Sequence, residues 1–144
     1  MKIADILSEF YQDQQWSISN NDYATLDWLE INPTPKPSLA EIEAKEAEFL
    51  QFQTDRENYK TALQSGYTVQ PEGFTLKLDE KDRQAFTSML LLVKEGLDLS
   101  LIDNNTIQTI TDNSGITQSI TTLRFRQIMV GYGMYYKSLW DNLP

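Results

Sequence analysis

The sequence predicts an α+β fold that is mostly helical: an acidic N-terminal arm with a long helix, then two core helices joined by a β-hairpin. Three observations lead to this prediction. Apolar residues recur every three or four positions in several segments, as in helices with one buried face. Residues 106–120 are rich in Thr and Ile around a turn sequence, which favours paired strands. Residues 1–60 hold 12 of the 21 acidic residues but only 5 of the 12 basic ones, so the first part of the chain is the acidic one.

Composition narrows the possible functions. The chain has 144 residues, of which 40% are hydrophobic, enough for one ordinary domain with a core. Because Cys and His are both absent, disulfides, the usual zinc sites and histidine-based catalysis are excluded. The formal net charge of −9 disfavours phosphate backbones, so we expect no nucleic-acid partner. We also expect no membrane partner and no secretory signal, since no segment approaches the roughly 18 apolar residues of a membrane span.

Residues 1–37 are predicted to form a short helix, a pair of strands and a stiff connector. Apolar residues at spacings of three and four predict a helix over residues 3–12. The aromatic residues and the alternation in 16–18 and 23–28 favour a small hairpin or two edge strands. Three prolines in 33–37 force extended backbone, so this run is predicted to connect and not to be helical.

Residues 38–66 are predicted to form one long acidic helix. Ser38 and Glu41 match a capping box, and helix-forming residues continue without a break to Gln64. Gly66 stands where a left-handed C-terminal cap belongs. The helix would be about 39 Å long at 1.5 Å per residue. Since its apolar stripe is thin, we expect this helix to pack against another chain.

Residues 67–144 are predicted to form an α+β core domain. The segment 67–78 is irregular and ends in a short strand, and Asp79 is expected to cap a helix over about 80–100. A hairpin is expected over 106–120, and Thr121 or Thr122 is expected to cap the last helix.

Two details of this domain concern glycines. The hairpin register is left open, because Gly115 can take the left-handed position of a bulge, or Asn113 and Ser114 can form a two-residue loop that exchanges the two faces. Gly131 and Gly133 weaken the last helix, and we expect the close approach of another backbone to compensate.

Candidate chemical groups have simpler structural explanations. Glu41, Glu43, Glu46 and Glu48 resemble the carboxylates of a di-metal bundle, but such bundles also need His. The Asp-rich runs at 103–105 and 112–114 lack the full calcium-loop pattern and are explained by turns. We therefore predict no catalytic, cofactor-binding or metal-binding residues, and no enzymatic activity.

The residues predicted to contact a partner are aromatic. Three lie near the N-terminus, in a segment that is small for burying them, and others lie on the long helix or cover a second face of the last helix. A wide buried stripe is the alternative for those on the last helix. The candidates are Trp16, Tyr23, Trp28, Phe49, Phe52, Tyr59, Tyr135 and Trp140.

Two parts of the chain resemble small proteins encoded beside the tail-fibre and baseplate genes of tailed bacteriophages. Residues 21–28, with Tyr23 and Trp28, and residues 36–42, with Lys-Pro-Ser leading into an acidic helix, resemble the N-terminal segment of these proteins. Residues 54–144 resemble a phage domain of unknown function, in which a helix, an Asp/Asn-Gly hairpin and a Thr-capped helix follow each other. That family has no established catalytic residues, so none are transferred.

The resemblance implies a virion tail protein that attaches other proteins. Its partner would be a tail-fibre or baseplate protein, and we expect a homo-oligomer, either a dimer or a trimer. An assembly chaperone in the host cytoplasm, which leaves before the virion is complete, is the first alternative. A wall- or capsule-degrading enzyme and an acidic cytoplasmic regulator are alternatives from other classes.

Overall fold

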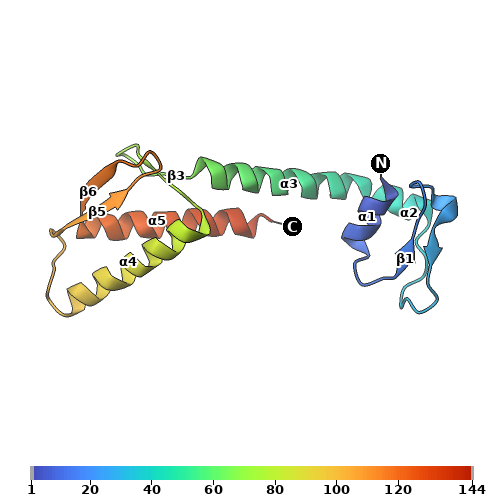
Figure 1. The fold of residues 1–144 in the computed structure, drawn as a ribbon, viewed down its shortest axis with the longest axis horizontal. Helices are drawn as coiled ribbons and strands as arrows, with labels where there is room; N and C mark the ends of the chain where they lie inside the picture. Colours follow the sequence, from blue (N-terminus) through green and yellow to red (C-terminus); the bar gives the residue numbers. More distant parts are fainter. Residues whose placement is uncertain (1, 144) are drawn as a thin grey trace. The chain divides into compact units, whose positions relative to one another are not determined.

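The structure is a computed structural model that describes residues 2–143, and these form two compact units (Figure 1). Unit 1 ends at Thr54 and unit 2 begins at Asp55. Helices predominate and each sheet is a small antiparallel pair, so the predicted α+β, mostly helical class is confirmed. The division falls inside a helix, and not at the limits predicted after residues 37 and 66.

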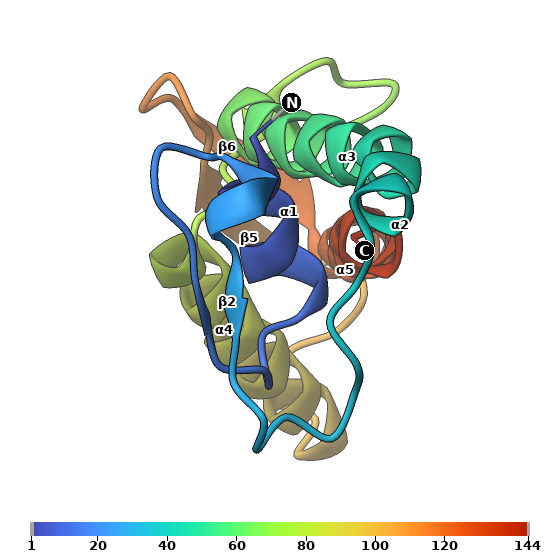
Figure 2. The same cartoon turned by 90° about the vertical axis from the view of Figure 1, so that its right-hand side faces the viewer.

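Unit 1 begins with the predicted helix and strand pair. Helix α1 is Ile3–Phe10, and the strands are β1 (Trp16–Ser17) and β2 (Asp27–Trp28), with a 3-10 turn, η1 (Tyr23–Thr25), between them. The two strands pair antiparallel with Trp16 opposite Trp28. Helix α1 lies beside these strands and beside the short helix α2 (Leu39–Ala44) in both views (Figures 1 and 2).

Unit 1 has a hydrophobic core of its own. One face of α1 packs against a residue that precedes β2 and against a residue of α2. The buried residues are Ile3, Ile6, Leu7, Leu26 and Ile42. The predicted acidic N-terminal arm is therefore a compact unit in this segment, because three elements converge and cover the apolar face of α1.

The long helix is interrupted once. Its predicted capping box is confirmed: the Ser38 hydroxyl accepts from the Glu41 amide at 3.2 Å, and the Glu41 carboxylate accepts from the Ser38 amide at 2.6 Å. The helix does not run unbroken, since α2 ends at Ala44 and α3 covers Glu46–Ser65. The Lys45 amide donates to the carbonyl of Ile42, three residues back, which tightens the turn directly after a fully buried residue.

Unit 2 contains the rest of α3, two further helices and two strand pairs. Strand β3 (Tyr67–Thr68) pairs with β4 (Thr75–Leu76), and helix α4 is Glu80–Asp98. Strand β5 (Ile107–Thr111) pairs with β6 (Thr117–Thr121), and helix α5 is Thr122–Asp141. The predicted caps are confirmed at Asp79 and Thr121. Strand β3 was not predicted, because Tyr67–Thr68 has too few residues to show alternation.

The hairpin adopts the bulged alternative. Thr111 lies opposite Thr117, and Gly115 has a φ of 80°, in the left-handed region. This register points Ile110 and Ile120 to the buried side. Gly66, with a φ of 78°, likewise occupies the predicted left-handed cap after α3.

The core of unit 2 gathers around α5. Its buried residues come from α5, α4, the hairpin and the segment before α4, all within the predicted core domain of residues 67–144. They are Val69, Leu76, Leu78, Phe86, Val93, Ile110, Ile120, Phe125, Ile128, Met129 and Tyr132.

Among the described residues, no other backbone approaches the Cβ positions of the two glycines of α5, so the prediction is wrong for contacts within this chain. A Cβ on Gly131 would collide with the hydroxyl of Tyr67, so this glycine makes room for a side chain. A Cβ on Gly133 would meet no atom of the chain within 4 Å.

We predict that truncation in either core destabilises the protein and that the acidic helix tolerates change. Ile128→Ala, at a fully buried position, is expected to cost about 2–5 kcal/mol of unfolding free energy, whereas Glu43→Gln on exposed α2 is expected to change it by within about 0.5 kcal/mol. Denaturant melts of the full chain measure both. In hydrogen exchange, Ile6→Ala is expected to lower protection in residues 2–54, because the two cores share no residue. An Ile128→Ala variant as stable as the parent would contradict this account of the core.

Candidate interaction surfaces

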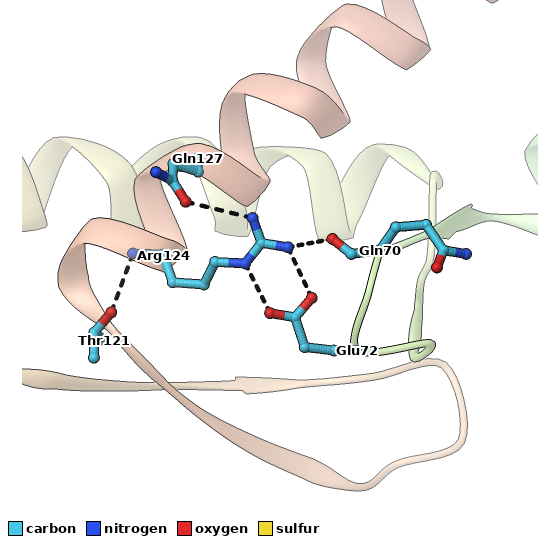
Figure 3. Close-up of polar contacts among 5 residues, drawn as sticks. All are labelled: Gln70, Glu72, Thr121, Arg124 and Gln127. Carbon is cyan, nitrogen blue, oxygen red and sulfur yellow. Dashed lines mark hydrogen bonds and ion pairs between the residues drawn. The ribbon is translucent and has the colours of Figure 1, made fainter.

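Arg124 fixes a turn of unit 2 onto the first turn of α5 (Figure 3). Its backbone amide donates to the Thr121 cap at 3.2 Å, which places the side chain beside the turn that joins β3 to β4. The guanidinium binds both carboxylate oxygens of Glu72, each at 2.7 Å, and donates to the carbonyl of Gln70. A planar guanidinium suits this paired geometry, so Arg124 holds the turn at both a side chain and a backbone atom.

The contacts of Arg124 with Glu72 and Gln70, which we call the Arg124 clamp, change the pKa values of both Arg124 and Glu72. Hydrogen bonds from Arg124 hold the pKa of Glu72 below its ordinary value, and the bond to Glu72 raises the pKa of Arg124. Both groups are therefore charged at neutral pH. The ion pair and the bond to Gln70 hold the turn in place against α5.

The Asp-rich turns are explained by backbone hydrogen bonds, as predicted. Asp112 is buried, and its carboxylate accepts from the amides of Ser114 and Ile116 and from the side chain of Gln118 at 2.8–3.0 Å. These donors lower the pKa of Asp112. Asp103 accepts in the same way from the next turn of chain. Within residues 2–143, no group of three or more Asp or Glu is arranged to hold a metal ion.

The three N-terminal aromatic candidates are half-buried in unit 1. The Tyr23 hydroxyl donates to the carbonyl of Pro37 at 2.8 Å, and the Trp28 indole donates to that of Thr34 at 2.9 Å. Trp16 lies opposite Trp28 in the strand pair. These contacts hold the proline connector against the unit. Whether the same rings also meet a partner stays a prediction.

The candidates on α3 and α5 have internal neighbours as well. Phe49 packs on the core of unit 1, and the Phe52 ring lies 5.6 Å from that of Phe10. In unit 2, Tyr59 meets Trp140 edge-on at 6.5 Å, and the Tyr135 ring lies 5.5 Å from that of Tyr67. Trp140 is still 60% exposed, which leaves it the most available of the eight.

A leucine-rich surface on α4 was not predicted. Four side chains on this helix and just after it are 59–76% exposed, and we call them the leucine face: Leu91, Leu92, Leu99 and Leu101. The sequence signal was the unbroken apolar run from Met89 to Val93, since five consecutive apolar residues cannot share one helical face.

A groove also opens between α4 and α5, with a volume of about 840 Å³. Phe86, Leu90, Met129 and Tyr132 contribute apolar surface to it. At one end the Arg83 guanidinium stacks on the Tyr136 ring at 4.0 Å from the centroid. We call this the α4/α5 groove.

A hydrogen bond to the chain fixes the buried tyrosine of the groove. The Tyr132 hydroxyl donates to the carbonyl of Lys77 at 2.6 Å, and burial raises its pKa well above the ordinary value. Tyr132 is therefore a neutral packing residue at physiological pH.

Comparisons with protein-family models, with curated proteins and with solved structures find no match to this chain. None of the helices in residues 2–143 combines the length and the apolar character that crossing a bilayer requires.

We predict that the Arg124 clamp stabilises unit 2 in a pH-dependent way. Glu72→Gln keeps the shape of the side chain but loses the ion pair, and it should cost about 1 kcal/mol at pH 7, as expected for a partly exposed pair with extra hydrogen bonds. Because the pKa of Glu72 is lowered in the folded state, its stabilising effect is present above the ordinary value of 4.5 and is lost as the pH falls through the folded-state value. Unfolding free energies of parent and variant should therefore converge in acid. Glu57→Gln, which removes an exposed pair with Lys60, is the matched control. A difference that is constant from pH 7 to pH 3 would contradict the linkage.

Proposed function

We propose that this protein is a structural component of a phage tail, in a tail fibre or baseplate, and that it works by attaching other proteins and not by catalysis. The resemblance of residues 21–28, 36–42 and 54–144 to proteins encoded beside tail genes supports the location. The leucine face of α4 is the observation that carries the binding role.

The leucine face is costly to leave in water. Full burial of a leucine side chain contributes about 1.5–3 kcal/mol relative to exposure, and scattered single apolar residues are common on surfaces. Four mostly exposed leucines within eleven residues are not scattered, and a concentration of this kind marks protein interfaces. A partner that covers these four leucines would remove their apolar surface from water.

Helix α3 supports association between copies of the chain. It has 20 residues, and none of them is fully buried. Helices in proteins gain most of their stability by packing an apolar face against other elements, so a helix of this kind gains from a neighbour. We propose that α3 packs in a homo-oligomer, a dimer or a trimer, within the tail.

We predict stoichiometric amounts of the protein in purified virions. Mass spectrometry of gradient-purified particles should detect it, and changing both Leu91 and Leu92 to Gln should lower its incorporation about ten-fold or more, since an apolar interface would then bury amides. The control changes Ile107 and Ile116 to Gln, because these are exposed on the hairpin and lie outside the leucine face.

The same experiment separates the alternatives. Absence from particles combined with co-purification with a fibre protein from lysate would replace the structural role by that of an assembly chaperone. Absence from both would refute a tail function and favour the regulator. Equal incorporation of the leucine variant and the control would show that the leucine face does not make the attachment.

A further inference from the structure

We propose that the α4/α5 groove binds an acidic amphipathic helix of a partner protein. The proposal rests on the binding role proposed above but not on a location in a phage tail. It concerns unit 2 alone and uses a surface distinct from the leucine face.

The groove has the dimensions of a short helix. Its lining on α4 runs from Glu80 to Leu90, which is about 15 Å at 1.5 Å per residue, or close to three helical turns. Phe86, Met129 and Tyr132 provide apolar surface between the two helices. A third helix laid here would bury its own apolar stripe on them, as in other helix-in-groove complexes.

The glycine at position 133 also supports a helix in the groove, and this support does not depend on the length of the groove. Gly133 lines the groove in the middle of a 20-residue helix, where glycine is less favourable than alanine by roughly 1 kcal/mol. Gly131, two residues earlier, is explained inside the chain because Tyr67 occupies the space of its side chain. Apart from its chain neighbours and the backbone of its own helix, no atom of the described residues lies within 4 Å of the Cβ position at Gly133. The bare backbone of α5 at this point lets an incoming helix approach closely.

The charges beside the groove select an acidic occupant. On α5, Arg124 is paired with Glu72 and Lys137 with Asp141, which leaves Arg126 as the cation of this helix outside these two ion pairs. Arg126 precedes Met129 by three residues and Gly133 by seven, so it lies along the same side of α5 as these lining residues.

Helix α4 adds to this positive border. Arg83 lines the end of the groove, and Lys94 follows Leu90 by four residues. Glu80 and Arg83 are the one acidic and the one basic residue of the described lining, so the excess positive charge comes from Arg126 and Lys94 beside it. Carboxylates on the outer edges of a bound helix would therefore lie near cations on both sides, which favours this partner and disfavours a basic one.

The test uses two labelled peptides and the full-length protein. Each is a helix-stapled peptide of about 14 residues, or four turns, with Leu at positions i, i+4, i+7 and i+11. One carries Glu at the remaining positions and the other carries Lys. Fluorescence anisotropy is expected to show binding of the Glu peptide that is about ten-fold or more tighter than that of the Lys peptide, and weaker at high salt. Equal binding of both peptides, or no binding of the Glu peptide at millimolar protein, would overturn the proposal.

Matched variants locate the binding. Gly133→Leu fills the groove and improves helix propensity, so the thermal midpoint should be unchanged or higher while affinity for the Glu peptide falls about ten-fold or more. Ser138→Leu adds the same side chain at an exposed position of α5 outside the lining, and should leave binding unchanged. Arg126→Glu should reverse the preference between the two peptides. Full affinity in Gly133→Leu would overturn the proposed site.

The two proposals fail separately. Peptide binding that depends on Gly133, in a protein absent from virions, would support the groove and refute the tail role. A protein present in virions whose groove takes neither peptide would refute the groove alone.

Discussion

The architecture of unit 2 depends on burial of one face of α5. Phe125 and Ile128, in its first two turns, are almost completely enclosed, and α4, the β5–β6 hairpin and the segment before α4 all reach this face. The Thr121 cap starts the helix directly at the end of β6, so the hairpin and the helix enter the core together. The same cap sets Arg124 beside the turn that it clamps. Loss of packing at Phe125 would therefore release the hairpin, the turn and the groove at once.

A unit of this size cannot enclose every apolar residue that its helices carry. Unit 2 has 90 residues, and its core takes one stripe each from α4 and α5. The leucines on the opposite side of α4 have no internal neighbours that would cover them, and Val130 and Met134 on α5 are in the same position at 59% and 69% exposure. Such residues neither build the core nor improve solubility. This exposure is the observation from which a contact with another protein is proposed above.

The features that could be predicted are those set by neighbours in sequence. The capping box at Ser38, the caps at Asp79 and Thr121, and the Gly115 bulge each depend on four or five consecutive residues, and all are present. The missed features depend on distant residues. Arg124 binds Glu72 across 52 positions, and Ile42 helps to bury α1 across more than 30. The sequence around the break at Lys45 contains no Pro or Gly, so the pattern predicted a continuous helix there. The leucine face was missed because periodicity identifies an apolar stripe without showing how much of the helix is covered.

Gly131 and Gly133 lie two residues apart in α5 but have different surroundings. Both glycines weaken α5 by a similar amount, and the sequence offered one explanation for the pair. Tyr67 explains the first from within the chain, and the second borders a groove that the chain leaves open. The groove differs from the leucine face in its charged residues: Glu80 and Arg83 line the groove and Arg126 and Lys94 lie on its two helices beside it, whereas exposed leucines dominate the face. Two surfaces of different chemistry can discriminate between two partners, because charge selects for one while apolar area serves the other. Under the two proposals made above, this protein would hold two different proteins together, as a connector in an assembly does.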